Sequence, residues 1–429
     1  MKVTITTLIL ISITCRLTAQ DIDKIINPAT VKQVESTLAS DDMRGRGSFT
    51  PDIERAADYI ESRFKAAGLK TWNGSHSYRQ PFSMVQTTLI STTATLDGQL
   101  QPTGHVVAVS SVKDLTVDEK SGYSITRIKA GGSFLVEVMK YTHPTKNTIV
   151  LLDTSYGAQF ARLTRFSRHH FKSDYSVIFL VTVQDPAHYS IHIQQDVKEE
   201  GKLSNVVGIL PGKSKAKEIV IFSGHYDHLG VGKPDAKGDS IYNGANDDAS
   251  GTTAMIMLAD YFAKQKHRTR TLVFAAFTAE EIGEYGSQYF SSQFDPTTVV
   301  AMFNIEMIGS ESKWGGNSAF ITGYERSDMG KILQRNLTGS AFTFYPDPYT
   351  EQNLFYRSDN ASLARQGVPA HTISTTQIDK DKYYHQRSDE IGTIDIDNMT
   401  RIIKAIALSS TSIVEGKDIP TRVDTNQLR

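Results

Sequence analysis

The spacing of apolar residues near the N-terminus is helical. Two segments each place apolar side chains three or four residues apart, which is the period of one helix face. These positions are Val31, Val34 and Leu38 in the first segment, and Ile53, Ala57, Ile60 and Phe64 in the second. The second segment follows Thr50-Pro51 and ends at Gly68. Proline is favoured at helix starts and glycine just past helix ends, so the pattern predicts two packing helices.

From about residue 82 to residue 196 the pattern changes to short apolar runs separated by turn residues, which is typical of strands. The runs cover 88–96, 104–109, 133–139, 148–152 and 176–183, with one weaker helical pattern at 158–171. This texture predicts an inserted β-rich domain at 82–196. The remaining segments, 20–81 and 197–429, would form the second domain.

Strands and helices alternate after residue 205. Strand patterns cover 218–223, 271–277, 299–307, 319–322 and 370–373, and helix patterns cover 250–266, 285–293, 329–337 and 397–414. Such alternation predicts an α/β fold in which helices cover both faces of a sheet. Ligands of such folds bind at the carboxyl ends of the strands.

The composition is that of a soluble globular protein. Of the 429 residues, 39% are hydrophobic and 22% are charged, and the formal net charge is -1. This balance gives no electrostatic reason to expect a nucleic-acid or anionic-membrane partner. Beyond the N-terminus, no apolar run reaches the roughly 18 residues that a membrane span needs.

The first residues resemble an export signal. Lys2 is followed by a mostly apolar run from Val3 to Thr14, and Leu17-Thr18-Ala19 resembles a cleavage site. We therefore predict a signal peptide at 1–19 and a periplasmic or extracellular location. Cys15, the only cysteine, leaves acylation of a lipoprotein as the alternative.

Five separate stretches carry side chains that bind divalent metals. Most of them follow predicted strands, and their candidate ligands are His225, Asp247, an acid of the pair Glu280-Glu281, Glu306 and His385. Zinc takes imidazole nitrogen and carboxylate oxygen. The set is sufficient for two Zn²⁺ ions per chain.

Two of these stretches contain acids that are expected to be buried, and a buried carboxylate is unfavourable without a nearby positive charge. Glu280 and Glu281 directly follow the apolar strand 271–277, and Glu306 lies inside the apolar run 299–308. Adjacent acids repel each other and lose hydration, which metal coordination by one and proton transfer by the other would offset.

Three residues beside the candidate ligands need a separate assignment. Asp227 is placed to accept the second ring N–H of His225, as carboxylates beside zinc ligands do, whereas His228 is more typical of an ordinary surface histidine. Spacing does not decide whether Asp247 or Asp248 faces the metals, although Asp248 better suits a turn or helix cap.

Taken in order, the five motifs resemble those of the zinc-dependent exopeptidases that include bacterial leucyl aminopeptidases, glutamate carboxypeptidase and glutaminyl cyclase. The resemblance covers about residues 28–80 and 200–415 and implies a mixed central sheet flanked by helices. It assigns His225 and Glu306 to one zinc, Glu281 and His385 to the other, and Asp247 to both. It further implies that Glu280 is the general base, that Asp227 orients His225, and that Tyr384 donates a hydrogen bond to the oxyanion.

Two features depart from that family. Aspartate is more common where this chain has Glu306, and a glutamate there is expected to coordinate with altered geometry. The segment 82–196 resembles a degenerate protease-associated domain that lacks the usual glycine signature.

The expected activity is that of a secreted aminopeptidase acting on peptides with a free N-terminus. Two dications lower the pKa of a shared water from about 15.7 to near 7, and Glu280 would carry the proton to the leaving amine. The alternatives are a carboxypeptidase that uses Arg357 or Arg387 to bind the terminal carboxylate, then a glutaminyl cyclase, then a non-catalytic binding ectodomain.

Overall fold

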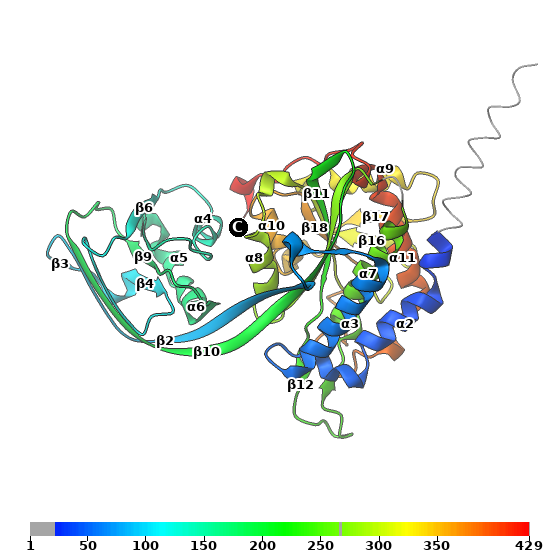
Figure 1. Ribbon diagram of the computed structural model, residues 1–429, viewed down its shortest axis with the longest axis horizontal. Helices are drawn as coiled ribbons and strands as arrows, with labels where there is room; N and C mark the ends of the chain where they lie inside the picture. Colours follow the sequence, from blue (N-terminus) through cyan, green and yellow to red (C-terminus); the bar gives the residue numbers. More distant parts are fainter. Residues whose placement is uncertain (1–21, 266–267, 429) are drawn as a thin grey trace, which may run out of the picture. The chain divides into compact units, whose positions relative to one another are not determined.

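The computed structural model describes residues 22–265 and 268–428 (Figure 1). These residues divide into two compact units, one formed by 22–80 with 204–423 and the other by 81–203 with 424–428. The predicted export signal at 1–19, including Cys15, lies outside the described residues. Among the helices of the described residues, none combines the length and apolar character needed to cross a membrane.

The first unit is built on a mixed sheet, in the order β17-β16-β18-β15-β11-β14-β10 with β1 beside β10. β11 pairs in parallel with β14 and β15, whereas β10 and β16 run antiparallel to their neighbours β14 and β18. This confirms the predicted mixed central sheet. The strands are β1 Lys70–Thr71, β10 Tyr189–Leu210, β11 Lys215–His225, β14 Arg270–Phe277, β15 Val299–Ile305, β16 Ser318–Ile321, β17 Thr343–Pro346 and β18 Ala370–Ser374.

Parallel pairing brings three strand ends to one edge of this sheet. Phe222 of β11 pairs with Phe274 of β14 and with Phe303 of β15. Its ring stacks on theirs at centroid distances of 5.6 and 4.9 Å. Because the three strands are in register and point the same way, the residues that follow them emerge together at the carboxyl edge.

Helices cover both faces of the sheet (Figure 1). α2, α3, α7 and α11 pack on one face, and α8 and α10 lie on the other. The helices are α2 Pro28–Leu38, α3 Pro51–Ala67, α7 Ser250–Lys264, α8 Tyr285–Ser291, α9 Met329–Asn336, α10 Asn360–Ala364, α11 Ile396–Ser409 and α12 Thr411–Val414. α3 is capped by Thr50, has Pro51 in its first turn and ends at Gly68 with φ 78°, which confirms the predicted boundaries.

The second unit combines two sets of strands with short helices. One set is a four-stranded sheet in the order β4-β9-β7-β6; in the other, β2 pairs with β3 and β8, and the N-terminal part of β10 pairs with β5. Its elements are β2 Arg79–Leu96, β3 Gln99–Leu100, β4 Val106–Val109, β5 Asp114–Asp118, β6 Ser124–Ile128, α4 Phe134–Met139, β7 Thr148–Leu152, α5 Gly157–Phe160, α6 Leu163–Arg168, β8 His169–Phe171 and β9 Val177–Val181.

One predicted strand of this unit is wrong. Residues 133–139 were expected to be a strand, but Phe134–Met139 form the helix α4. The reason is topological: β6 and β7 pair in parallel, and parallel neighbours need a crossover that leaves the sheet. The helical pattern at 158–171 is also divided, into α5, α6 and the strand β8.

Candidate metal centre

The five predicted ligand positions converge at the carboxyl edge of the sheet. His225 ends β11, Glu281 lies in the loop after β14, and Glu306 directly follows β15. Asp247 lies in a short irregular turn, Ala245–Ala249 (η5), before α7, and His385 lies in the long loop after β18. Segments from residue 225 to residue 385 thus meet at one place.

The first cluster contains His225, Asp247 and Glu306, whose ligand atoms lie within 4.8 Å of one another. His225 Nε2 is 3.3 Å from Asp247 Oδ1. His225 Nδ1 lies 3.1 Å from the backbone oxygen of Asp227. A proton on Nδ1, donated to that oxygen, leaves the lone pair of Nε2 for a metal.

The second cluster contains His385, Glu281 and Asp247, together with His228. His385 Nε2 lies 3.2 Å from Asp247 Oδ2 and 3.0 Å from Glu281 Oε2. His228 Nδ1 lies 2.6 Å from Glu281 Oε1. Asp247 belongs to both clusters, which is the position that a bridging carboxylate requires.

His228 is a residue whose environment the sequence did not reveal. It was expected to be an ordinary surface histidine, but it is buried, and it forms a possible metal group with Asp247 and Glu281. Its place in the same motif, three residues after His225, was the available signal. It contacts Glu281 Oε1 while His385 contacts Oε2, so both imidazoles are close enough to serve the second cluster.

Three buried polar atoms without hydrogen-bond partners show whether a metal fits between the two clusters. Asp247 Oδ2, Glu306 Oε2 and His225 Nε2 are buried and have no hydrogen-bond partner among the described residues. Buried polar atoms are nearly always hydrogen-bonded, and nitrogen and carboxylate oxygen are the ligands zinc prefers. The residues present therefore fit zinc.

The structure separates the two adjacent aspartates. Asp247 faces both clusters, whereas Asp248 is occupied by backbone N–H groups. Asp248 Oδ1 accepts from Gly251 N at 2.9 Å and Met307 N at 3.0 Å, and Oδ2 accepts from His225 N at 3.2 Å. Asp248 therefore holds the start of α7 against the two ligand-bearing strand ends.

Asp227 has a different set of contacts from the one expected. The acceptor from His225 Nδ1 is the backbone oxygen of Asp227, and its carboxylate Oδ1 is 3.8 Å away. The carboxylate instead accepts from Ser48 Oγ at 3.0 Å and from Glu280 N at 3.1 Å. Asp227 thus connects the histidine loop to the loop that carries Glu280.

Carboxylates crowd the site. Burial, with Glu306 and Asp359 nearby, raises the pKa of Glu280 well above its usual value, and burial raises the pKa of Glu306 to about 7. The neighbouring carboxylates of Asp247 and Glu281 raise the pKa of His385 to about 10. Several acids this close together are stable in ionised form only beside positive charge, which is the second property expected of a metal centre.

Two buried residues outside the predicted set hold the ligand loops. Arg46, in the turn Asp41–Arg46 (η1), is fully buried and donates to the backbone oxygens of Tyr226 at 2.8 Å, Asn243 at 2.5 Å and Gly244 at 2.9 Å. Asp389 accepts from Asn246 N at 2.8 Å and Asp247 N at 3.0 Å. No local spacing in the sequence indicates either role.

Three non-glycine residues at the site have positive φ angles, in the left-handed region. Ala279 has φ 59°, Met307 has φ 53° and His385 has φ 56°. Non-glycine residues rarely adopt these angles, and such strain clusters at functional sites. Ala279 and Met307 are immediate neighbours of Glu280 and Glu306, so the turns that aim these acids are strained.

Tyr384 lies between the metal centre and a cavity. Its ring stacks on His385 at 3.9 Å, and burial raises the pKa of its phenol. It lines a cavity together with Glu306 and Arg357. The hydrogen bond to an oxyanion predicted for Tyr384 remains a prediction.

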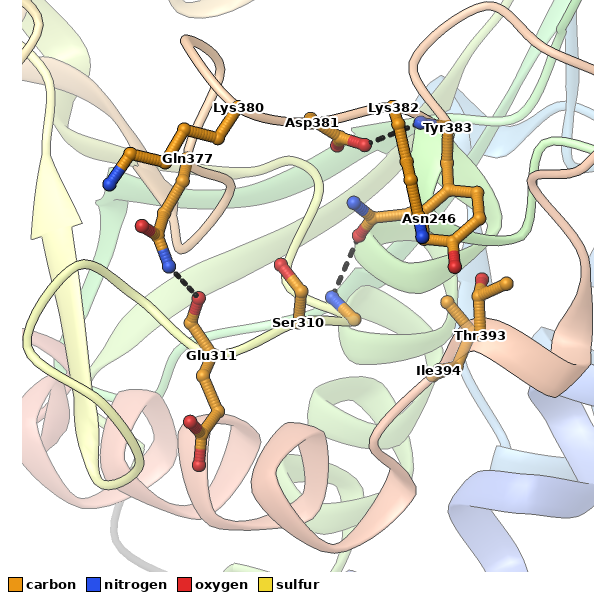
Figure 2. Close-up of a pocket in the computed structure, with 11 residues that line it drawn as sticks. Asn246, Ser310, Glu311, Gln377, Lys380, Asp381, Lys382, Tyr383, Thr393 and Ile394 are labelled. Carbon is orange, nitrogen blue, oxygen red and sulfur yellow. Dashed lines mark hydrogen bonds between the residues drawn. The ribbon is translucent and has the colours of Figure 1, made fainter.

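Figure 2 shows another cavity, of about 490 Å³, on the side of Asn246. The Asn246 side chain accepts from Gly309 N at 2.8 Å, and Lys382 and Tyr383 also line the cavity (Figure 2). None of the predicted metal ligands lines this cavity. Asn246 and Tyr383, which do line it, are the sequence neighbours of Asp247 and Tyr384.

Comparison with known proteins finds similarity over the part of the chain that carries the candidate ligands. Residues 205–410 match the profile of peptidase family M28. A probable zinc metalloprotease of Pyrenophora tritici-repentis is 33% identical over 262 residues, which cover 52% of this chain and 60% of that protein. Leucine aminopeptidase 1 of Ajellomyces capsulatus is 23% identical over 315 residues, which cover 68% of this chain and 79% of that protein.

A solved structure shares the fold. The aminopeptidase from Aneurinibacillus sp. strain AM-1 superimposes with a TM-score of 0.53 at 16% identity, over 95% of this chain and 97% of that one. The chain spans less than two thirds of the length of the first curated relatives that it matches.

Proposed function

We propose that the protein is a member of peptidase family M28, whose profile residues 205–410 match, and that it is a zinc-dependent aminopeptidase with two zinc ions per chain. Its substrates would be peptides with a free N-terminus. The observation that carries the proposal is the convergence of buried, unsatisfied ligand atoms from His225, Asp247 and Glu306 beside Glu281 and His385.

The residues divide into two ligand sets that share one carboxylate. His225 and Glu306 would hold one zinc, Glu281 with His385 or His228 would hold the other, and Asp247 would contact both. When bound, the ions supply Lewis-acid chemistry that acidifies water and polarises a peptide carbonyl.

In this proposal Glu280 is the general base. Its Oε2 lies 4.0 Å from His225 Nε2, at the edge of the first cluster, and its backbone N–H is held by Asp227. It takes the proton of the attacking water and delivers it to the leaving amine, a role worth roughly 100- to 10,000-fold in rate.

The aminopeptidase assignment is supported by the names of the relatives and by the charge of the site. Leucine aminopeptidase 1 and the Aneurinibacillus enzyme are named as aminopeptidases. Glu280, the acid of this group that is not assigned to a zinc ion, offers an anionic partner for a substrate ammonium group. A dipeptide blocked at its N-terminus should therefore resist cleavage, whereas one blocked at its C-terminus should be cleaved.

Replacing Glu280 with glutamine tests the mechanism. The variant should lose at least about 100-fold in kcat, because the amide keeps the shape of the side chain but cannot accept the proton. Its zinc content, measured by atomic absorption, should match that of the wild type. Glu311→Gln is the matched control, because Glu311 is exposed, lines the cavity of Figure 2 and belongs to neither candidate metal group. Full activity of Glu280→Gln would refute the assignment.

Two rival functions have distinct outcomes. A binding ectodomain on this fold would contain no zinc after purification, and a glutaminyl cyclase would release pyroglutamate from glutaminyl peptides without cleaving a peptide bond.

We also propose that the protein is exported. N-terminal sequencing of secreted material should then begin near residue 20, and retention of the full chain in the cytoplasm would contradict export.

A further inference from the structure

The cavity beside Glu306 and Tyr384 has mixed chemistry. Met307, Phe320 and Leu354 contribute apolar walls, and Arg357 is the one basic side chain among the described residues that line it. We propose that this cavity receives the side chain of the substrate's N-terminal residue and that Arg357 makes it select a carboxylate, so that aspartyl and glutamyl peptides are preferred. The inference rests on the proposed aminopeptidase function.

Arg357 is available for a ligand. Within residues 22–265 and 268–428 its guanidinium makes no ion pair with a carboxylate, and its side chain is exposed. Arg387, the other arginine considered from the sequence, lies over the ring of Tyr242 at 4.7 Å and donates to the backbone of Lys233. Of the two, only Arg357 combines a free charge with a place in the cavity.

Arg357 shares its cavity with the candidate ligand Glu306. Arg357 and Tyr384 line the same cavity, and the ring of Tyr384 stacks on that of His385 with 3.9 Å between the centroids. A substrate carboxylate bound by Arg357 would therefore lie in the cavity that Glu306 and Tyr384 also line. That is where the first side chain of a peptide cleaved at its N-terminus has to be.

Three other polar side chains of the cavity do not replace Arg357 as a donor. The hydroxyl of Thr372 donates to Asn360 at 2.7 Å, and those of Ser374 and Thr376 donate to the backbone oxygen of Met307 at 3.2 and 3.0 Å. Their protons are used within the protein. The charge of Glu306, which would repel an anion, is the charge that a metal ion would neutralise.

The size of the cavity favours a short side chain. Its volume is about 50 Å³, and a single water occupies about 10–15 Å³ by the same measure, so there is room for roughly four water-sized groups. An aspartate or glutamate side chain is of that size. The rings of tryptophan or phenylalanine would require the walls to move.

The test compares isosteric substrates. Wild-type protein is assayed on glutamyl, glutaminyl and leucyl p-nitroanilides, and then Arg357→Gln is assayed on the same set. Hydrogen bonds to charged groups are worth about 1.5–3 kcal/mol. The variant should thus lose about 10- to 100-fold in kcat/KM on the glutamyl substrate and less than about 3-fold on the glutaminyl one. Arg387→Gln should leave the ratio of the two rates unchanged.

Binding gives a second readout that does not depend on turnover. Isothermal calorimetry with Glu280→Gln protein should show tighter binding of L-glutamate than of L-glutamine. The difference should vanish in the double variant that carries both Glu280→Gln and Arg357→Gln. Equal affinities would overturn the inference.

The possible failures are distinguishable. If wild type cleaves glutamyl and glutaminyl substrates equally while releasing leucine, the aminopeptidase function stands and the role of Arg357 is wrong. If no substrate with a free N-terminus is cleaved, the proposed function itself fails. If N-blocked peptides with a free C-terminus are cleaved, and Arg357→Gln abolishes that, the carboxylate at Arg357 is the chain terminus and not a side chain.

Discussion

Arg46 joins two segments that carry metal ligands. Its side chain bonds the backbone of Tyr226, between His225 and Asp227, and the backbone of Asn243 and Gly244, just before Asp247. Its backbone oxygen also accepts from His228 N at 3.2 Å. A single buried guanidinium therefore sets the spacing of both clusters.

Arg46→Lys should weaken the metal centre. Lysine keeps the charge, but one ammonium group cannot reach carbonyls on both loops, and disturbing residues that hold ligands typically costs 10- to 100-fold in metal affinity or activity. Zinc titration with a competing chelator measures the loss. Arg44→Lys is the control, because Arg44 is exposed and its guanidinium lies 3.5 Å from the carboxylate of Asp52, away from the ligand loops. Equal zinc affinity in both variants would contradict this role.

Glu35 is a fully buried acid on α2 whose two carboxylate oxygens have no hydrogen-bond partner among the described residues. Burial raises its pKa from 4.5 to about 8, and the charge of Arg46 offsets only part of that rise. The folded protein therefore keeps this proton at a pH where the unfolded chain has released it. Its contribution to stability is complete below the unfolded pKa and is lost as the pH rises to about 8.

Glu35→Gln should remove this dependence. Between pH 5 and pH 8 the free energy of unfolding of the variant should rise relative to that of the wild type by roughly 4 kcal/mol, an order-of-magnitude value from the pKa shift. Urea denaturation at a series of pH values, with chelator present, measures it. The exposed Glu351→Gln should run parallel to wild type, and a pH-independent difference for Glu35→Gln would contradict the argument.

At the scale of elements, the site depends on how closely α7 approaches β15. A Cβ on Gly251, in the first turn of α7, would lie 2.0 Å from the backbone oxygen of Ile305 and 2.4 Å from Asp248 Oδ2. Only a residue without a side chain permits this contact. The contact in turn lets Asp248 hold the backbone of Met307 and His225.

Gly251→Ala should push α7 away from the sheet. Overpacking of this kind costs about 1–3 kcal/mol, and the displaced Asp248 should also lower zinc affinity. Thermal unfolding and zinc titration measure both effects. Gly392→Ala, where an added Cβ meets nothing within 4 Å, should be neutral. An unchanged unfolding temperature in Gly251→Ala would show that the helix can shift freely.

At the scale of the whole molecule, both candidate metal groups of the described residues lie in the unit formed by 22–80 and 204–423. Metal binding should therefore stabilise that unit and leave the unit at 81–203 unaffected. A ligand present at 100 times its dissociation constant adds about 2.7 kcal/mol to the state that binds it.

Chelation is the corresponding experiment. Treatment with a zinc chelator should abolish activity and increase hydrogen exchange in the ligand-bearing segments, without changing exchange in β7 and β9 of the other unit. Added zinc should restore both properties, and magnesium should not. Unchanged exchange in both units after verified zinc removal would argue against a metal centre in the folded protein.

Much of this protein follows from local patterns. The boundaries of α3 could be predicted from Thr50-Pro51 and Gly68, and the strands before His225, Glu280 and Glu306 from their apolar runs. Helix period, capping and strand composition act over a few residues. The candidate ligand set could be named from the sequence for a related reason: acids at the ends of buried strands are costly unless something binds them.

Only the tertiary structure decided the rest. It selected Asp247 over Asp248, brought His228 to Glu281, made residues 133–139 a crossover helix and placed Arg46 beneath both loops. Each outcome depends on contacts between distant segments, such as the bond from Arg46 to Asn243 across 197 positions of sequence. Periodicity and composition carry no information about such pairings, because the energy that determines them arises only when the folded chain brings the partners together.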